Sequence, residues 1–235
     1  MALNPRRRGA NRLIEALPSH DRRRLIARCD VVEVVFEDVL NEADAPIRHV
    51  YFPLTSLISV IMPIDESASL EVGLIGDEGM FGIPLALDVG VSPMRAVVQG
   101  TGTALRMDAA GFRRELERRK ALRRDIDRYV FVHLSQVART AGCTRFHVVE
   151  ARLARWLLMT QDRAHADSFR ITQEFLAAML GVRRVGVTRA AGSLQKRGLI
   201  RYSRGNITVL DRRGLKGASC GCYKADREAY ARILG

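Results

Sequence analysis

The sequence predicts an α+β fold in which an antiparallel β sandwich or roll is followed by a long helix and a winged helix-turn-helix. Short β-like runs broken by Gly, Pro and Asp occupy residues 31–107, and no helical segment alternates with them. That pattern favours antiparallel over parallel sheets. A helical pattern then covers residues 112–145, and two short helices with a hairpin follow within residues 170–209.

Length and composition fit a folded protein with two parts. The 235 residues are enough for two modest domains that each bury a core. Hydrophobic residues make up 47% and charged residues 27% of the chain, which is typical of a soluble globular protein. The longest charge-free apolar run, residues 50–64, is shorter than the about 20 residues of a membrane helix, and the N-terminus lacks the apolar core of a secretory signal. We therefore expect a cytoplasmic protein with no membrane partner.

The net charge of +12 is unevenly distributed along the chain. Residues 31–111 carry 3 basic and 12 acidic side chains, whereas residues 145–235 carry 18 basic and 7 acidic ones. The acidic middle of the chain and its basic C-terminal part therefore indicate two different functions. The basic part is the one expected to bind a polyanionic partner. A solvated basic surface would give the same charges, so charge alone leaves nucleic-acid binding open.

Residues 1–30 are predicted as a helical lead-in. It carries arginine triplets at positions 6–8 and 22–24, which we interpret as a solvated face. The β-rich domain follows over residues 31–112. Its expected strands are Asp30–Phe36, His49–Phe52, Leu57–Met62, Ser69–Ile75, Ala96–Gln99 and Thr103–Met107.

A glycine-rich loop lies between the fourth and fifth of these strands and opens with Gly76, Asp77, Glu78 and Gly79. Exposed backbone amides in such a loop can hold an anion. Plain turn glycines are the simpler interpretation, and the residues alone leave both open.

Residues 113–145 are predicted as one long helix with an apolar stripe. The stripe recurs at spacings of four and three residues, and a polar histidine interrupts it. Such a stripe can pack within the chain or form a two-stranded seam with a second copy. The residues assigned to this dimer interface are Ile126, Val130, His133, Val137 and Ala141.

The last part of the chain is predicted as a helix-turn-helix domain over residues 146–217 with a tail over residues 218–235. Gly142, just before it, is interpreted as a hinge between domains. The domain's first helix is expected over residues 146–160. Its core stripe consists of Phe146, Val149, Leu153, Trp156 and Leu157.

The segment from Arg170 to Val209 has the spacing of a helix-turn-helix. Thr172 can cap the first helix by accepting a free backbone amide, and Gly181 suits the left-handed conformation of a tight turn. Small Ala177 stands where two such helices cross closely. A hairpin with Gly205 and Asn206 as its flexible pair then forms a wing.

The second helix of this segment keeps Arg183, Arg184, Thr188 and Arg189 on faces that packing does not use. Together with the basic charge of the domain, these side chains predict a module that reads DNA.

The order of a β-rich domain, a long helix, the run TQEFLAAMLGVRRVGVTRAAGSLQKRGLI and a wing resembles the Crp/Fnr family of bacterial transcription regulators. The resemblance covers about residues 20–217, and its specific part is 171–209. It implies a double-stranded β-helix (jelly-roll) sensor related to cyclic-nucleotide-binding domains, a dimerising helix and a C-terminal winged helix-turn-helix. In that family the helix after the turn enters the major groove, and Thr172, Arg184 and Arg189 match its DNA-contacting positions.

The resemblance and the chemistry together assign two sets of DNA contacts. Arginine can donate two hydrogen bonds to guanine, which discriminates by roughly 1–3 kcal/mol per pair. The base-reading residues are Arg184, Val185, Thr188 and Arg189. The backbone contacts are Thr172, Arg183, Lys196, Arg201 and Arg204.

Two residues depart from the family's usual DNA-reading pattern. The family usually places Glu, which accepts from cytosine, after the first recognition arginine, whereas Val185 follows Arg184 here. We therefore predict a different half-site at that position. Arg183 occupies the place where Ser or Thr often caps the recognition helix, a loss of about 1 kcal/mol.

The sensor part departs further from the family pattern. The candidate effector pocket contains Gly76, Asp77, Glu78, Gly79 and Arg95, but the hydroxyl that usually accompanies the arginine is missing and two carboxylates repel a phosphate. Cyclic nucleotide binding is therefore disfavoured, and no cofactor is predicted.

The cysteines do not predict a metal. Cys29 stands alone near the N-terminus, where iron–sulfur members of the family carry several cysteines. Cys220 and Cys222 offer two thiolates without a nearby third ligand in the sequence, which is a weak metal site. No metal is therefore predicted, and a disulfide framework is not expected.

The sequence thus predicts a sequence-specific DNA-binding transcription regulator that acts as a homodimer on a pseudo-palindromic site, with double-stranded DNA as its partner and an effector that the sequence does not identify. The resemblance to the family further implies contact with RNA polymerase. The alternative is a ligand-binding sensor or adaptor whose helix-turn-helix contacts protein or RNA. No Ser/His/Asp order, carboxylate pair or phosphate-binding loop indicates an enzyme.

Overall fold

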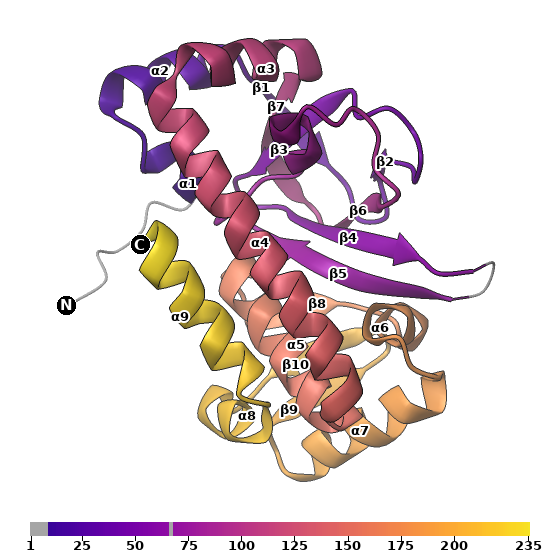
Figure 1. The fold of residues 1–235 in the computed structure, drawn as a ribbon. Coiled ribbons are helices and arrows are strands. Elements are labelled where there is room, and N and C mark those ends of the chain that lie inside the picture. The colour runs from indigo at the N-terminus through magenta and orange to yellow at the C-terminus, as the bar shows by residue number, and fades with distance from the viewer. Residues whose placement is uncertain (1–8, 66–67) are drawn as a thin grey trace. The chain divides into compact units, whose positions relative to one another are not determined.

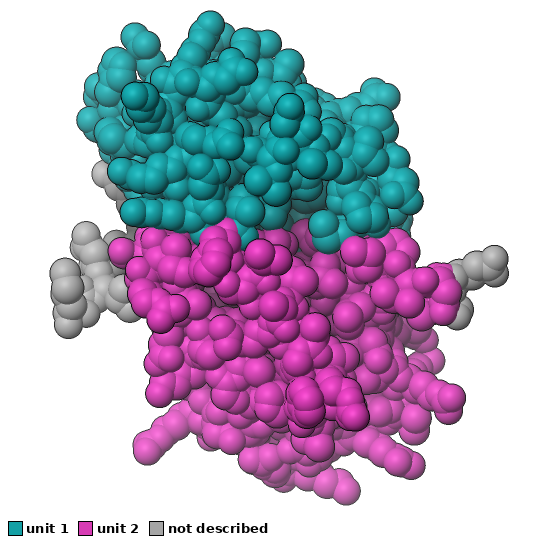
Figure 2. Space-filling model, in the orientation of Figure 1, with its two compact units in different colours: residues 1–59, 75–130 teal, residues 60–74, 131–235 magenta. Residues whose placement is uncertain are grey.

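The computed structural model describes residues 9–65 and 68–235, so the arginine triplet at 6–8 lies outside the described residues. The chain divides into two units, residues 1–59 with 75–130 and residues 60–74 with 131–235 (Figure 2). Strands β4 and β5 and helix α4 continue from one unit into the other.

The first unit holds most of the β-roll. Its strands lie in the three-stranded sheet β1-β7-β3 and in the sheet β2-β6-β4-β5 (Figure 1). Antiparallel pairing joins β1 to β7, β3 to β7 and β2 to β6. The strands are β1 Asp30–Val34, β2 Val39–Asn41, β3 His49–Pro53, β4 Leu57–Pro63, β5 Ser69–Ile75, β6 Arg95–Gly100 and β7 Gly102–Asp108. All six predicted strands are present, and the three-residue β2 is the one that the pattern missed.

The helical lead-in is tied to this roll by one buried side chain. Helix α1, Arg12–Glu15, is capped by Asn11, whose Oδ1 accepts from the amides of Leu13 and Ile14. The Asn11 amide group donates to the carbonyls of Pro53 at 3.0 Å and Gly79 at 2.8 Å. A second helix, α2, follows at Ser19–Ile26.

The predicted long helix is two helices. Helix α3 covers Ala109–Arg118, and α4 covers Lys120–Phe146. The break falls at Arg119, which has extended backbone angles, φ −123° and ψ 96°. The Arg119 guanidinium bonds to Asp21 at 2.9 Å and also pairs with Glu115, so the break is fixed by buried ion pairs.

The second unit contains the remaining helices and a small sheet of order β8-β10-β9. Its core consists of apolar side chains from the helices and strands together, including Leu157, Val187, Leu194 and Ile207. The elements are α5 Val149–Ala164, β8 Ser168–Arg170, α6 Gln173–Leu180, α7 Arg184–Lys196, β9 Ile200–Ser203, β10 Asn206–Val209, α8 Arg212–Ala218 and α9 Cys222–Leu234.

The residues predicted as a tail form helix α9, which is packed against the unit. Asp226 in α9 is buried and accepts from Arg139 and Arg155, each at 2.7 Å. These bonds join α9 to α4 and α5. Within the described ranges, no helix is long and apolar enough to cross a bilayer.

Two predictions about the helix junction are wrong. Gly142 lies inside α4, and the chain breaks only after Phe146. Phe146 was expected in the core of α5, but it ends α4 and is 78% exposed. Of the other members of that stripe, Leu153, Trp156 and Leu157 are buried as predicted, and Val149 is partly buried against the same core.

Strand β5 packs directly against α4 and α5 within the second unit. His133 of α4 is buried over Gly73, where an added Cβ would lie 2.6 Å from the His133 Cε1 atom. Trp156 of α5 donates its indole N–H to Glu71 of β5 at 2.9 Å. The close contact of Gly73 with His133 and the hydrogen bond of Glu71 with Trp156 therefore set the position of this strand.

Burial lowers the pKa of His133 from 6.5 to about 4, and the charge of Arg163 adds to the shift. The unfolded chain then binds this proton at a higher pH than the folded chain does, so stability is present above about pH 6.5 and is lost as the pH falls toward 4. The contribution is roughly 3 kcal/mol. We expect His133→Asn to remove this part of the acid sensitivity, as measured by urea unfolding followed by circular dichroism between pH 7 and 4.

The exposed His20 in α2 provides the control for this measurement. His20→Asn should leave the pH dependence unchanged. Parallel stability–pH profiles for the parent and the His133→Asn variant would contradict the prediction.

Candidate nucleic-acid interface

The predicted helix-turn-helix is present and its turn is well defined. Thr172 has extended backbone angles and accepts from the Phe175 amide at 3.1 Å, which caps α6. Gly181 ends α6 in the left-handed conformation at φ 59°. The Gly181 and Val182 amides donate back to the carbonyls of Ala178 and Ala177 at 3.2 and 3.0 Å, so the last carbonyls of α6 are satisfied.

Packing fixes which face of α7 meets solvent. Val187, Ala190, Ala191 and Leu194 are buried in the core of the unit. The small alanines allow a close approach of neighbouring helices. The predicted base readers Arg184, Val185, Thr188 and Arg189 all lie on the opposite, exposed face.

The apolar reader is as exposed as its charged neighbours. Val185 lies on the first turn of α7 and is 55% exposed, because nothing in the described chain covers it. Helix α7 begins after Arg183, and no described side chain caps it there, in line with the missing Ser or Thr. The Gly186 amide donates to the Arg183 carbonyl at 2.8 Å, and the amides before it can bind another acceptor such as a phosphate oxygen.

Arg184 is held by the preceding helix. Its guanidinium forms an ion pair with Glu174 at 2.6 Å and a hydrogen bond with Gln173 at 3.3 Å. Thr188 also donates to Gln173, at 3.1 Å. Both charged side chains are more than half exposed, and exposed pairs contribute only about 0–1 kcal/mol. The pair orients Arg184 but can be released when a stronger acceptor approaches.

We expect Glu174→Gln to raise DNA affinity about two- to fivefold. The change removes the competitor for Arg184 and a negative charge close to the DNA phosphates. Fluorescence anisotropy with a labelled operator at fixed salt measures the effect. Glu228→Gln is the matched control, since Glu228 pairs with Lys224 on the exposed face of α9. Equal changes for the two variants would contradict the role of Glu174.

The wing has three strands and a different turn from the one predicted. Strand β8 pairs with β10, which the polar sequence before α6 did not indicate. The turn residues with positive φ are Arg204 at 49° and Gly205 at 75°, while Asn206 is already the first residue of β10. The prediction of Gly205 and Asn206 as the turn pair is therefore wrong by one residue.

The wing lies next to the N-terminal end of α6 and contacts the last turn of α7. The Tyr202 hydroxyl donates to the Ile171 carbonyl at 3.1 Å, and the Tyr202 amide donates to Gln195 at 2.7 Å. A shallow groove is lined by Thr172, Arg184 and residues 202–205. The predicted backbone contacts Thr172, Arg183, Lys196, Arg201 and Arg204 are all exposed.

The loop predicted as an effector pocket is closed by its own neighbours. The Gly76 amide donates to the Glu78 carboxylate at 3.1 Å, and Asp77 and Glu78 are buried. An added Cβ at Gly79 would lie 2.1 Å from the Tyr129 hydroxyl, so this glycine is required by close packing. Arg95 forms an ion pair with Glu42 at 2.9 Å. The loop and the arginine are therefore each engaged within the first unit.

The exposed apolar stripe of α4 differs from the predicted one. Ile126 is fully buried and His133 is also buried, so neither is available to a second copy. Val130 and Val137 are half-buried, and Ala141 is exposed. Apart from Phe146 at its end, the large apolar side chains of α4 that reach solvent are Phe131, 57% exposed, and Leu134, 62% exposed. With Ala138 and Ala141 they recur at spacings of three, four and three residues.

The fold combines a β-roll, a long helix and a winged helix-turn-helix with exposed arginines on its second helix. These features define the class of helix-turn-helix DNA-binding proteins. Residues 151–218 match the family model of the Crp-like helix-turn-helix domain, so the chain carries this domain. No curated protein sequence matches the chain.

Solved structures confirm the predicted resemblance and fold class. A transcriptional regulator of the Crp/Fnr family from Eubacterium rectale is 16% identical, with a TM-score of 0.68 over 88% of this chain and 96% of that one. FixK2 from Bradyrhizobium japonicum is 14% identical, with a TM-score of 0.69 over 82% of this chain and 98% of that one. The c-di-GMP-responsive regulator CLP from Xanthomonas campestris is 16% identical, with a TM-score of 0.67 over 82% and 99%. The chain has the Crp/Fnr fold.

Proposed function

We propose that this protein is a sequence-specific DNA-binding transcription regulator that acts as a homodimer on a pseudo-palindromic operator. The observation that carries the proposal is the row Arg184, Val185, Thr188 and Arg189, which is exposed on α7 of a Crp-like helix-turn-helix domain. Nothing in the packing of the domain requires two arginines and a valine on that face.

The two sets of exposed residues would make different contacts with DNA, one with bases and the other with phosphates. Arg184 and Arg189 would donate to guanine edges in the major groove, and Val185 would contact a thymine methyl group in place of a cytosine contact. Thr172, Arg183, Lys196, Arg201 and Arg204 would bind phosphates and position the helix without reading sequence. The uncapped start of α7 favours a phosphate at the same place.

The exposed stripe on α4 supports a dimer. Phe131 and Leu134 are large apolar side chains on the surface of this helix. Pairing with the same stripe of a second copy would remove them from water, with Ala138 and Ala141 allowing close approach. Two recognition helices would then enter successive major grooves, with half-sites about 34–36 Å apart.

We propose that strand β5 links the β-roll to the helix-turn-helix. Packing of β5 against α4 and α5 gives a route by which the β-roll could bias the helix-turn-helix. An effector bound at Gly76, Asp77, Glu78, Gly79 and Arg95 would have to displace the ion pair of Arg95 with Glu42 and the hydrogen bond of Gly76 with Glu78. Activation through contact with RNA polymerase and repression by occlusion are both compatible with the fold.

An in vitro selection from a random DNA library tests the proposal. We expect an inverted repeat with guanines in each half-site. At the position where the usual family site has the cytosine that Glu contacts, we expect a thymine. The binding constant for the selected site should also fall steeply with salt. For each phosphate contact, its logarithm should fall by about 0.9 for every tenfold rise in salt concentration. Failure to enrich any repeat, with weak salt dependence, would favour the adaptor that binds protein or RNA instead.

A further inference from the structure

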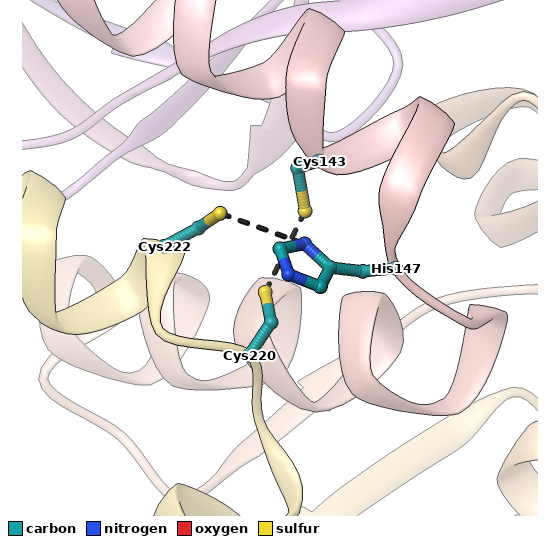
Figure 3. A group of neighbouring side chains, drawn as sticks. All are labelled: Cys143, His147, Cys220 and Cys222. Atoms are coloured by element: carbon teal, nitrogen blue, oxygen red, sulfur yellow. Dashed lines mark hydrogen bonds between the residues drawn. The ribbon is translucent and has the colours of Figure 1, made fainter.

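Four potential metal ligands from distant parts of the sequence meet in the second unit. Cys143 lies near the end of α4, and His147 follows directly after that helix. Cys220 lies on the segment just before α9, and Cys222 is the first residue of that helix (Figure 3). The three sulfur atoms and a ring nitrogen of the histidine all lie within 4.8 Å of one another.

The distances match the edges of a tetrahedral metal site. A tetrahedral zinc ion with usual bond lengths places two sulfur ligands about 3.8 Å apart and a sulfur and a nitrogen ligand about 3.6 Å apart. The Cys143 and Cys220 sulfur atoms are 3.5 Å apart, and the Cys222 sulfur is 3.7 Å from His147 Nδ1. Both pairs therefore have the separation that a shared ion would impose.

Two other arrangements fit these distances less well. All four cysteines of the chain are free thiols, and 3.5 Å is far beyond the about 2.05 Å of a disulfide bond. In a cubane iron–sulfur cluster each cysteine sulfur binds a different iron, so the sulfur atoms lie further apart than these do. The contacts are those of ligands to one ion.

We propose that Cys143, His147, Cys220 and Cys222 bind a single divalent transition-metal ion of the zinc type. Three cysteines and one histidine are a usual ligand set for structural zinc. With all four positions supplied by the chain, no site is left open for a substrate. The inference is independent of DNA binding.

The surroundings suit the charge of such a complex. Binding requires three thiols to release their protons to solvent, so Zn²⁺ with three thiolates carries a net charge of −1. Arg155 and Arg152 are close enough to interact electrostatically with Cys143 and Cys220. Both arginines are buried, so their attraction is weakly screened by water.

The site is partly open, which allows loading. Cys143 and Cys220 are buried, Cys222 is half-buried and His147 is exposed. An ion could therefore enter from the side of His147 and be enclosed by the two buried sulfur atoms. The ion would fasten the start of α9 to the end of α4, beside the Asp226 bonds to Arg139 and Arg155.

The sequence indicates only one half of the site. Cys220 and Cys222 are visible there as a weak pair of thiolates, because the other two ligands precede them by more than 70 residues. A signal was present: Cys143 and His147 are four residues apart, which places them on one face of a helix.

Metal content of the purified full-length protein tests the inference. We expect about one zinc per chain by inductively coupled plasma mass spectrometry, and loss of that zinc in Cys143→Ser and Cys220→Ser variants. Cys29→Ser is the matched control, because Cys29 lies in the first unit, where its sulfur donates to the Leu25 carbonyl at 3.3 Å. This variant should keep its zinc.

Substitutions at the exposed ligand keep the test independent of folding. His147→Ala should weaken zinc binding roughly tenfold or more in a competition titration with a chromogenic chelator, and His147→Cys should restore it. Cobalt(II) bound to the apoprotein should give the visible bands of a tetrahedral thiolate site, altered in His147→Cys. The proposal is overturned if the folded apoprotein binds neither ion, if Cys29→Ser loses as much zinc as Cys143→Ser, or if iron is recovered instead.

Discussion

Replacing Phe131 and Leu134 together by glutamate should convert the protein to a monomer and weaken operator binding by about 10²–10⁴-fold. Both side chains lie on the exposed face of α4 and are more than half exposed in the single chain. Burying each in a dimer would contribute about 1.5–3 kcal/mol. Glutamates at these positions would instead bring like charges together in an apolar seam.

The loss of DNA affinity follows from the loss of the second half-site. In a dimer, binding of one recognition helix holds the other near its half-site at a high effective concentration. A monomer binds one half-site only and loses this gain. The isolated helix-turn-helix surface would remain unchanged, so weak binding with normal base preference should persist.

Sedimentation equilibrium and binding to a full operator and to a single half-site measure both effects. Leu87→Glu is the matched control, since Leu87 is an exposed leucine that belongs to the segment Ile83–Leu87 and not to α4. A double variant that remains a dimer would show that another surface holds the two copies together.

Replacing Arg184 or Arg189 by alanine should each reduce specific binding by roughly 1–3 kcal/mol per half-site, or about 2–6 kcal/mol for a dimer on two half-sites. The variants should also relax base preference at the positions those residues read, whereas binding to random DNA should change little. Arg184 carries a further requirement, because it must leave Glu174 before it can reach a base.

Two comparisons make this measurement decisive. Arg201→Ala should weaken binding to all sequences alike and reduce the salt slope by about 1 per half-site, which is the behaviour of a phosphate contact. Arg232→Ala, an exposed arginine of α9, should have no effect. Competition assays against operators with single base changes distinguish the cases. If Arg184→Ala and Arg189→Ala bind the selected operator as the parent does, base reading lies elsewhere.

The elements with strong local signals could be predicted from the sequence. Alternating strands, the Thr172 cap, the Gly181 turn and the buried face of α7 all depend on residues close together in the chain. The break at Arg119 could not be predicted in this way, because Asp21, one of its ion-pair partners, is about 100 residues away. Strand β8 has only three residues and is specified by its neighbour β10.

The face of α4 illustrates the limit of periodicity. A stripe at spacings of four and three fits burial within the chain as well as contact with a second copy. The stripe that includes Ile126 and His133 is used inside the chain, and the stripe with Phe131 and Leu134 is the exposed one. Only the contacts with other elements distinguish the two, and these cannot be read from a single helix.

Trp156 is the one tryptophan of the sequence, and its environment makes it a built-in optical reporter. Its indole is buried and donates to a carboxylate of strand β5, while its backbone belongs to the first helix of the Crp-like domain. Any rearrangement that separates Glu71 from α5 would change the polarity around the indole. The emission wavelength of the unlabelled protein would then record movement between β5 and α5, so candidate effectors can be screened without attaching a dye.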